Sequence, residues 1–277
     1  MKPAFPPLVL AAVLALAPGG LRGLDFSSSF QTFKVAARPG TTVTRTFELR
    51  LSDQQPRVHF KAHIEDWWQS EDGTHSFYRE PGTLARSCGR WIALDPGEMA
   101  VETGGTLAVR ITATIPASAG PGGYWCALTV DELPDPLAPP LTGVGIRFLA
   151  SISTGIFLFL DPVVRQIEIS DVEIAPRRAR LTVRNTGNAP VWVDGHVEIF
   201  RQGSEEAPVA KADLPSTTLL TGPFARRFVM ASLPDLAALP AGRYRVRVIL
   251  DLGLDHLVGA QKDLVLPNDL AKPTPGR

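Results

Sequence analysis

Histidines and carboxylates are the side chains of this sequence that could support acid–base or metal chemistry. His59 and His63 are four residues apart, so on a strand both would project from one face, with Lys61 between them. Zinc binds imidazole nitrogens, but a lysine ammonium beside the ligands repels the cation, and the sequence places no third ligand. We therefore predict no metal and no cofactor, and we interpret both histidines as part of a solvated strand face.

Catalytic motifs are absent from the sequence. It has no Gly-x-Ser-x-Gly elbow, no glycine loop for phosphate and no metalloprotease helix. The pairs Glu65-Asp66 and Glu71-Asp72 leave a glycan hydrolase open, because a glycosidase site is defined by the separation of its carboxylates in space. We predict a protein that is not an enzyme, with a hydrolase as the less favoured alternative.

Aromatic side chains are better candidates for a binding site. Trp67 and Trp68 are adjacent, so on a strand they point to opposite faces, one into the core and the other outward. An exposed tryptophan beside Tyr78 could stack on a sugar or hold a peptide. The candidate residues for binding a partner or a glycan are Trp67, Trp68, Tyr78 and Trp125, and burial in a core is the alternative for each of them.

The composition indicates a folded chain built of short elements. Of 277 residues, 44% are hydrophobic and 20% are charged, which is too little charge for a disordered chain. The 28 basic and 28 acidic residues balance, so nothing attracts the chain to nucleic acid. Its 24 glycines and 25 prolines are spread between apolar runs, a pattern that favours strands and turns over long helices.

The first residues have the layout of a secretory signal peptide. Lys2 precedes an uninterrupted apolar run over residues 8–17, and proline and glycine follow it. That run is too short to span a bilayer, which takes about 20 residues. We predict a signal peptide over residues 1–23, export to the periplasm, the cell surface or the medium, and no transmembrane anchor in the mature chain.

Export makes the two cysteines interpretable. Cys88 and Cys126 would meet an oxidising compartment, where an even number of cysteines usually indicates pairing. A bond between them would close a loop of about 39 residues and stabilise the fold by roughly 4 kcal/mol on the chain-entropy model. We predict this disulfide, with two buried free thiols as the alternative.

Hydrophobic alternation predicts an all-β fold of two immunoglobulin-like β-sandwich domains in tandem. Apolar and polar residues alternate with the period of a half-buried strand in many segments, among them residues 42–51, 58–68, 107–115, 124–130, 178–185, 191–201 and 243–252. Residues 144–160 form the long last strand of the first domain in this interpretation, because Arg147 and a small polar middle argue against a transmembrane helix. The predicted domains cover residues 24–163 and 164–267, followed by a disordered tail over 268–277.

Several of these segments resemble a known family. WWQSEDGTHSFYREPG at 67–82, SCGRWIAL at 87–94 and LAVRITATIPASAGPGGYWCALTV at 107–130 resemble the peptidoglycan-binding-like, immunoglobulin-like domain of WxL-interacting proteins. LTVRNTGNAPVWVDGHVEIF at 181–200 is similar to the immunoglobulin-like domain that follows it there. More distantly, the layout resembles the PapD-like pilus chaperones. Those hold a partner's terminal carboxylate with a basic residue near the end of the long strand, and residues 155–162 contain none.

The long apolar strand is where we expect a partner to bind. We predict that an open sheet edge or the groove between the domains accepts an extended segment in the manner of strand addition. This strand is the first candidate, because it would promote aggregation if it were left uncovered at a sheet edge. The candidate edge residues are Ile146, Phe148, Ile152, Ile156 and Leu158. The predicted function is a non-catalytic envelope protein that recognises an extended protein segment or a surface-protein partner, in a chaperone-like or surface-assembly role. A module that binds peptidoglycan or polysaccharide is the alternative.

Overall fold

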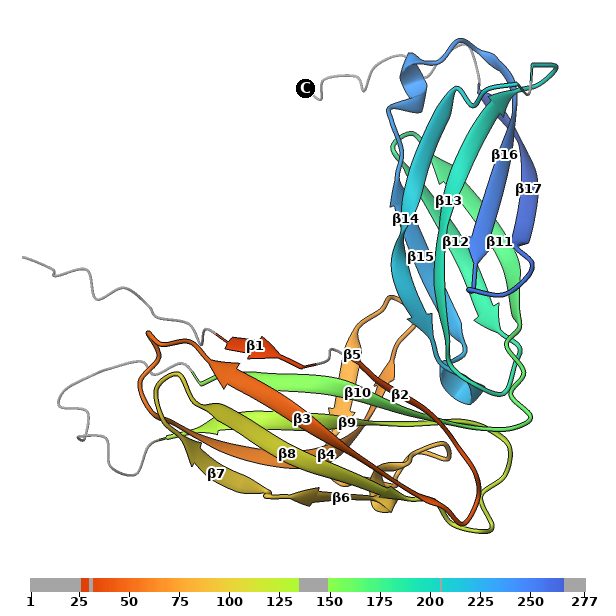
Figure 1. The fold of residues 1–277 in the computed structure, drawn as a ribbon. Coiled ribbons are helices and arrows are strands. Elements are labelled where there is room, and N and C mark those ends of the chain that lie inside the picture. The colour runs from red at the N-terminus through yellow and green to blue at the C-terminus, as the bar shows by residue number, and fades with distance from the viewer. Residues whose placement is uncertain (1–25, 30–31, 135–148, 205, 267–277) are drawn as a thin grey trace, which may run out of the picture.

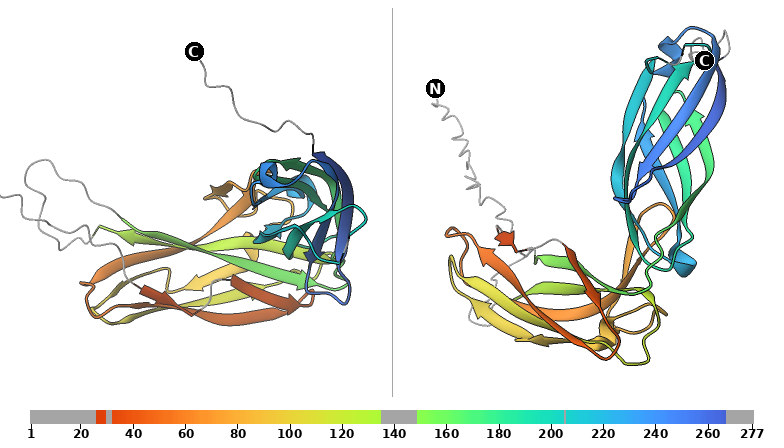
Figure 2. Two further views of the ribbon diagram at one scale, coloured as in Figure 1. Left: turned by 90° about the horizontal axis from the view of Figure 1, so that it is seen from above. Right: turned by 45° about the vertical axis from the view of Figure 1, so that its right-hand side comes forward.

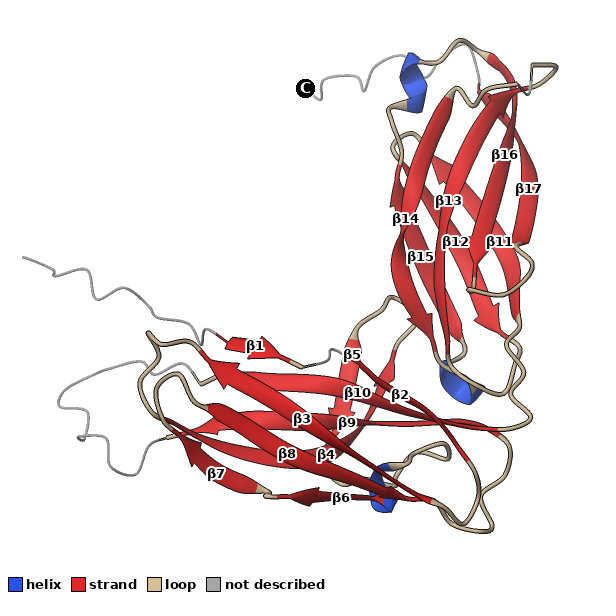
Figure 3. Cartoon of the chain, in the orientation of Figure 1, coloured by secondary structure: helices blue, strands red, loops and turns tan. Residues whose placement is uncertain are grey.

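Strands form almost all of the regular structure of this protein. The computed structural model describes residues 26–29, 32–134, 149–204 and 206–266, and within them it contains strands and three single-turn 3-10 helices (Figures 1 and 3). This confirms the predicted all-β class. The proposed signal peptide, the proposed tail, Ile146 and Phe148 lie outside the described residues. The described residues include no helix that could span a bilayer.

The first sandwich packs a sheet of order β1-β3-β8-β6 against a sheet of order β2-β10-β9-β4-β5, in which β7 also pairs with β4. Ten strands make up this sandwich: β1 (Phe26–Ser28), β2 (Thr32–Ala37), β3 (Thr42–Leu51), β4 (Val58–Gln69), β5 (His75–Tyr78), β6 (Ile92–Asp95), β7 (Glu98–Val101), β8 (Thr106–Thr114), β9 (Gly122–Leu133) and β10 (Ser151–Leu160). Alternate residues of these strands fill its core; Phe47, Phe60 and Leu128 are fully buried there.

The second sandwich packs a sheet of order β11-β12-β15 against a sheet of order β14-β13-β16-β17. Its strands are β11 (Ile167–Ala175), β12 (Arg178–Asn185), β13 (Val191–Arg201), β14 (Ala210–Leu219), β15 (Arg226–Ser232), β16 (Gly242–Asp251) and β17 (Val258–Leu266). Tyr244 donates a hydrogen bond from its hydroxyl to the carbonyl of Pro240, and Tyr124 does the same to Gly120 in the first sandwich. This tyrosine corner recurs in immunoglobulin-like domains.

The two sandwiches form an L, with the second standing on one end of the first (Figures 1 and 2). The hairpin of β4 and β5 rises from the first sandwich toward the second (Figure 1). At its tip, the backbone N–H of Phe228 donates to the carbonyl of Glu71 at 2.7 Å, and Arg226 forms an ion pair with the Glu71 carboxylate at 3.3 Å. The hairpin therefore links the two sandwiches beside the direct chain connection.

Candidate functional site

Aromatic side chains from both sandwiches meet where the two arms of the L join. Trp67, Trp125 and Phe157 project from the face of the β2-β10-β9-β4-β5 sheet that points away from its core. Residues of the second sandwich cover them, including Ala189, Leu220 and the half-buried Trp192. The rings of Phe157 and Trp192 meet edge to face with their centroids 4.9 Å apart. This cluster is a third hydrophobic cluster, separate from the cores of the two sandwiches.

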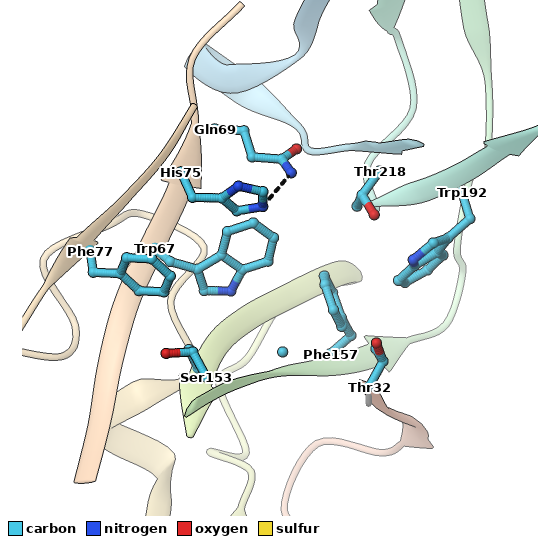
Figure 4. A pocket seen from close by; sticks show the side chains of 11 residues that line it. Thr32, Trp67, Gln69, His75, Phe77, Ser153, Phe157, Trp192 and Thr218 are labelled. Atoms are coloured by element: carbon cyan, nitrogen blue, oxygen red, sulfur yellow. Dashed lines mark hydrogen bonds between the residues drawn. The ribbon is translucent and has the colours of Figure 1, made fainter. Parts of the chain in front are cut away.

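A pocket of about 200 Å³ opens in this cluster. Figure 4 shows its two sides: β4, β5 and β10 of the first sandwich supply one wall, and β13 and β14 of the second supply the other. The lining residues are Thr32, Trp67, Gln69, His75, Phe77, Ala127, Ser153, Gly155, Phe157, Trp192 and Thr218. The pocket thus exists only when both sandwiches are in place.

The polar groups of the pocket lie on β4 and β5. The amide nitrogen of Gln69 lies 2.8 Å from Nε2 of His75 (Figure 4), and the His75 ring stacks on Trp67 at 5.5 Å. Burial and the nearby Arg227 guanidinium hold the pKa of His75 below its ordinary value. The imidazole is therefore neutral at pH 7 and its Nε2 accepts the hydrogen bond that the Gln69 amide donates.

A cation that the sequence analysis missed lies beside the pocket. The ammonium of Lys34 stands 3.3 Å from the centre of the Trp192 ring. Burial and the charge of Arg165 lower the pKa of Lys34. Residues 155–162 contain no basic residue; Lys34 belongs instead to β2 and pairs in register with Phe157 of β10. Only the pairing of two strands far apart in the sequence brings it there.

The predicted strand-addition edge is wrong for Ile156 and Leu158. β2 pairs in parallel with β10 from Gly155 to Leu160, and both side chains are buried in the first core. From Gly155 to Leu160, both edges of the apolar strand are therefore paired with strands of the same sheet. Ile152 precedes this pairing, and no described strand pairs with residues 151–154 on the side opposite β9. Among the described strands, residues 151–154 at the start of β10 therefore have β9 as their single neighbour.

The four aromatic candidates divide into two groups. Trp67 and Trp125 are only 6% and 1% exposed, and each indole N–H donates to a backbone carbonyl, so neither presents a ring to a ligand as an open platform. Trp68 stacks on Tyr78 at 4.4 Å and meets Phe224 on another side at 5.9 Å. Only Tyr78 is well exposed, at 44%. Trp68 is half-buried and Tyr78 stacks on its ring, so the tryptophan beside Tyr78 is only partly exposed.

Cys88 and Cys126 are brought together but are not joined in the structure. Both are free and buried, with their sulfur atoms 2.9 Å apart. Burial raises the pKa of the Cys126 thiol well above its ordinary value, and the adjacent Cys88 adds to this effect. The disulfide therefore remains a prediction, and the two sulfur atoms lie as close to each other as the bond requires.

The histidines and carboxylates form pairs with each other on the sheet surface. His59 lies 3.1 Å from Glu98, and His63 lies 3.1 Å from Glu65. Glu65 and Asp66 point to opposite faces of β4: Thr129 donates to Glu65, and the backbone of Thr83 donates to Asp66. These adjacent carboxylates therefore do not face each other across a cleft. Among the described residues, no group of three histidine, cysteine, aspartate or glutamate side chains is arranged to hold a metal ion.

Comparisons with known proteins concern the fold. No protein-family model matches the chain, and no curated protein sequence matches it, so the resemblance to WxL-interacting proteins gains no support. Solved structures with similarity include the class 5 fimbriae chaperone CfaA at 10% identity, with a TM-score of 0.46 over 86% of this chain and 99% of that chain. The E. coli chaperone DraB matches at 15% identity, with a TM-score of 0.42 over 88% of this chain and 98% of that chain. The complex of the Salmonella enterica SafA pilin with the SafB chaperone matches at 13% identity, with a TM-score of 0.44 over 89% of this chain and 99% of that chain.

Proposed function

We propose that this protein is an exported, non-catalytic binding protein that holds an extended segment of a partner protein by strand addition to residues 151–154 of β10. The observation that carries the proposal is that this edge, which no described strand other than β9 pairs with, borders the pocket between the sandwiches. Ser153 lies on the open edge, Gly155 is the first residue of β10 that β2 covers, and both line the pocket. The side chains of a strand added at this edge would therefore enter the pocket.

The backbone direction at the edge supports this geometry. The N–H of Glu132 in β9 donates to the carbonyl of Ala150 at 2.8 Å, so Ala150 faces β9. In antiparallel pairing, residues alternate between facing the partner strand and facing away from it. The N–H and C=O groups of Ser151 and Ser153 therefore point away from β9, into the position that an added strand would take. Main-chain bonds would supply affinity, and alternate side chains would supply specificity.

The predicted signal peptide and the structure of the site together indicate the class of partner. The apolar run at residues 8–17 supports export, so the partner belongs to the envelope or the cell surface. The buried state of Trp67 and Trp125 favours a protein segment over peptidoglycan, because sugars stack on exposed ring faces. A chaperone-like or surface-assembly role is the finer form of the proposal.

Photocrosslinking in the native envelope tests the proposal. A benzophenone amino acid in place of Ser151 should give a covalent adduct with one protein, and mass spectrometry should map the adduct to one extended segment. The matched control carries the same probe at Val265, which is 66% exposed on the edge strand β17. Equal adducts at both sites, or adducts with glycan alone, would contradict the proposal.

A pair of substitutions isolates the backbone contribution. Ser153→Pro removes an N–H that points to the open edge and leaves the bonds to β9 in place, whereas Ser153→Ala keeps that N–H. Both variants lose the contact between the Ser153 and Thr129 hydroxyls, so that loss cancels. We expect Ser153→Pro to lower the Ser151 adduct severalfold and Ser153→Ala to retain it. An unchanged adduct in Ser153→Pro would exclude main-chain pairing at this edge.

A further inference from the structure

A cluster of polar side chains lies beside residues 151–154, on the face of the sheet that points away from the first core. Thr129 of β9 pairs in register with Ser153 of β10 on one side and with His63 of β4 on the other. One position along, Asp131 of β9 pairs with Ser151 of β10. Three neighbouring strands therefore bring these side chains together, and the cluster reaches from His63 to the edge that is proposed to accept a strand.

Two carboxylates connect this cluster to the edge through hydrogen bonds. The Ser151 hydroxyl donates to Oδ1 of Asp131 at 2.6 Å. The Thr129 hydroxyl donates to Oε2 of Glu65 at 2.9 Å, and it lies 2.9 Å from the Ser153 hydroxyl. Asp131 thus contacts the edge directly, and Glu65 contacts it through Thr129. Each carboxylate uses one of its two oxygens for this purpose.

His63 lies between the other two carboxylate oxygens. Its Nε2 is 3.1 Å from Oε1 of Glu65, and its Nδ1 is 3.6 Å from Oδ2 of Asp131. A neutral imidazole has one N–H, so it can donate to one carboxylate while its other nitrogen turns a lone pair toward the second. An imidazolium has two N–H groups, one for each carboxylate. The position between two acceptors therefore favours the protonated ring over the neutral one.

The cluster is partly shielded from water and still open to protons. The side chain of His63 is 22% exposed, and those of Glu65 and Asp131 are 9% and 27% exposed. Solvent can therefore exchange protons with the ring, while the low exposure strengthens its interaction with both carboxylates. The proton comes from water, so no bulky ligand has to reach the ring nitrogens.

The other charged side chains near the cluster have separate partners or face solvent. They are Lys61 of β4, Arg79 after β5, Glu98 of β7 and Glu132 of β9. Arg79 approaches Glu65 only to 3.9 Å and is 87% exposed, and Lys61 is exposed as well, so water screens both cations. Glu98 lies 3.1 Å from His59, and Glu132 accepts the backbone N–H of Ala150 at 3.0 Å. His63 is thus the ionisable group that bridges Glu65 and Asp131.

We propose that His63 makes the strand-accepting edge sensitive to pH: the protonated ring ties Glu65 to Asp131, and the two carboxylates then hold residues 151–154 in the extended conformation that an added strand requires. When the ring is neutral, one carboxylate loses its donor and turns to water, which loosens the hydroxyl that it holds on the edge. Residues 151–154 respond because β9 is the one described strand that pairs with them. Histidine changes its charge between about pH 5 and pH 8, so mild acid should favour the bound partner.

This inference rests on the proposed function for the partner, whereas the change at the edge is a property of the chain alone. Hydrogen exchange of the full chain tests that change without a partner. The backbone N–H of Ile152 faces β9 and reports how firmly the start of β10 is held. After correction for the intrinsic pH dependence of exchange, its protection should rise about two- to fivefold from pH 7.5 to pH 5.5, as expected for partly exposed ion pairs. Constant or falling protection would overturn the inference.

Histidine variants assign the response to one ring. His63→Gln keeps a polar side chain that cannot gain a charge, so the protection of Ile152 should no longer change with pH. His59→Gln is the matched control, because His59 lies on the same face of β4 and pairs with Glu98 alone. This control should keep the full response. A response that persists in His63→Gln, or is lost in His59→Gln, would overturn the assignment.

A second variant reaches the same contact from the other strand. Asp131→Asn keeps an oxygen for the Ser151 hydroxyl but removes the charge that faces the His63 ring. It should therefore reduce the response of Ile152 to pH without releasing Ser151. Thermal unfolding of every variant at pH 7.5, compared with the parent chain, separates a lost response from a lost fold. An undiminished response in folded Asp131→Asn would contradict the bridge between the two carboxylates.

The partner is tested with the segment that the Ser151 probe maps, synthesised as a peptide and titrated into the unlabelled chain. The parent should bind it about two- to fivefold more tightly at pH 5.5 than His63→Gln does, and the two should bind it more equally at pH 7.5. If Ile152 responds to pH through His63 but the Ser151 probe finds no protein, the pH response stands and the proposed function fails. If the Ser151 probe maps a segment and the protection of Ile152 stays constant, strand addition stands and the role of His63 fails.

Discussion

Thr32, the first residue of β2, pairs with Gly155 in the middle of β10. This register divides β10 into two parts: the part from Gly155 to Leu160 lies between β2 and β9, and residues 151–154 have β9 alone among the described strands. Gly155 and Thr32, the first pair of this register, both line the pocket between the sandwiches.

Hydrogen exchange should show this division of β10. Backbone N–H groups of Ser151 and Ser153 point away from β9 and should exchange much faster than those of Phe157 and Phe159, which face β2. The amide of Ile152 is an internal control, because it faces β9 and should be protected. Slow exchange at Ser153 in the isolated protein would mean that the edge is already paired.

Trp192 should hold the two sandwiches together. Its ring contacts Phe157 and Phe159 of the first sandwich, and the ammonium of Lys34 lies over its face. Trp192→Ala should therefore lower the free energy of unfolding by about 2–4 kcal/mol and loosen the L. Chemical denaturation measures the loss of stability, and small-angle scattering measures the change in shape. An unchanged scattering profile would show that the β4–β5 hairpin suffices to fix the arrangement.

The tyrosine corner of the second sandwich should contribute to its stability. Tyr244 is buried and donates to the carbonyl of Pro240. Tyr244→Phe keeps the ring but leaves that carbonyl without its donor, so we expect a loss of about 1–2 kcal/mol in the free energy of unfolding. Tyr78→Phe is the control: Tyr78 is exposed, and its substitution should change stability little. Equal losses in both variants would contradict this role of the corner.

Asp72 should make the β4–β5 hairpin sensitive to acid. The Ser70 hydroxyl and the backbone N–H of Thr74 donate to its carboxylate and lower its pKa to about 2 from 3.8. Because the folded-state pKa is depressed, the stabilisation is fully present above pH 3.8 and is lost as the pH falls toward 2. Unfolding curves between pH 5 and pH 2 should therefore fall more steeply for the parent than for Asp72→Asn. Parallel curves would show that the turn does not stabilise the charged form.

Cys88 and Cys126 should be joined in the exported protein. Their sulfur atoms are 2.9 Å apart, and an oxidising compartment favours the bond. Protein purified from the envelope and denatured in an alkylating reagent should take up no label until it is reduced. Denaturation is required because burial and the raised pKa of Cys126 would slow labelling of free thiols as well. Labelling before reduction would establish free thiols.

The sequence by itself determined most of the strands, because alternation between two faces is a local property of the chain. Residues 42–51, 178–185 and 191–201 are strands with the predicted bounds. Strands β1, β5, β7 and β14 were missed: the first three have only three or four residues, and Pro215 interrupts the alternation of β14. The pairing of Cys88 with Cys126 was predicted from the even number of cysteines in an exported chain, and the fold brings the two residues together.

Only the tertiary structure decided which faces and edges stay open. Alternation places Trp67 and Trp68 on opposite faces of β4, but it does not say that Ala189 and Leu220 of another sandwich cover Trp67. In the same way, no local pattern in β10 predicts that β2 pairs with it. Pairing and packing between distant segments depend on the summed burial of many residues, and that sum exists only in the folded chain.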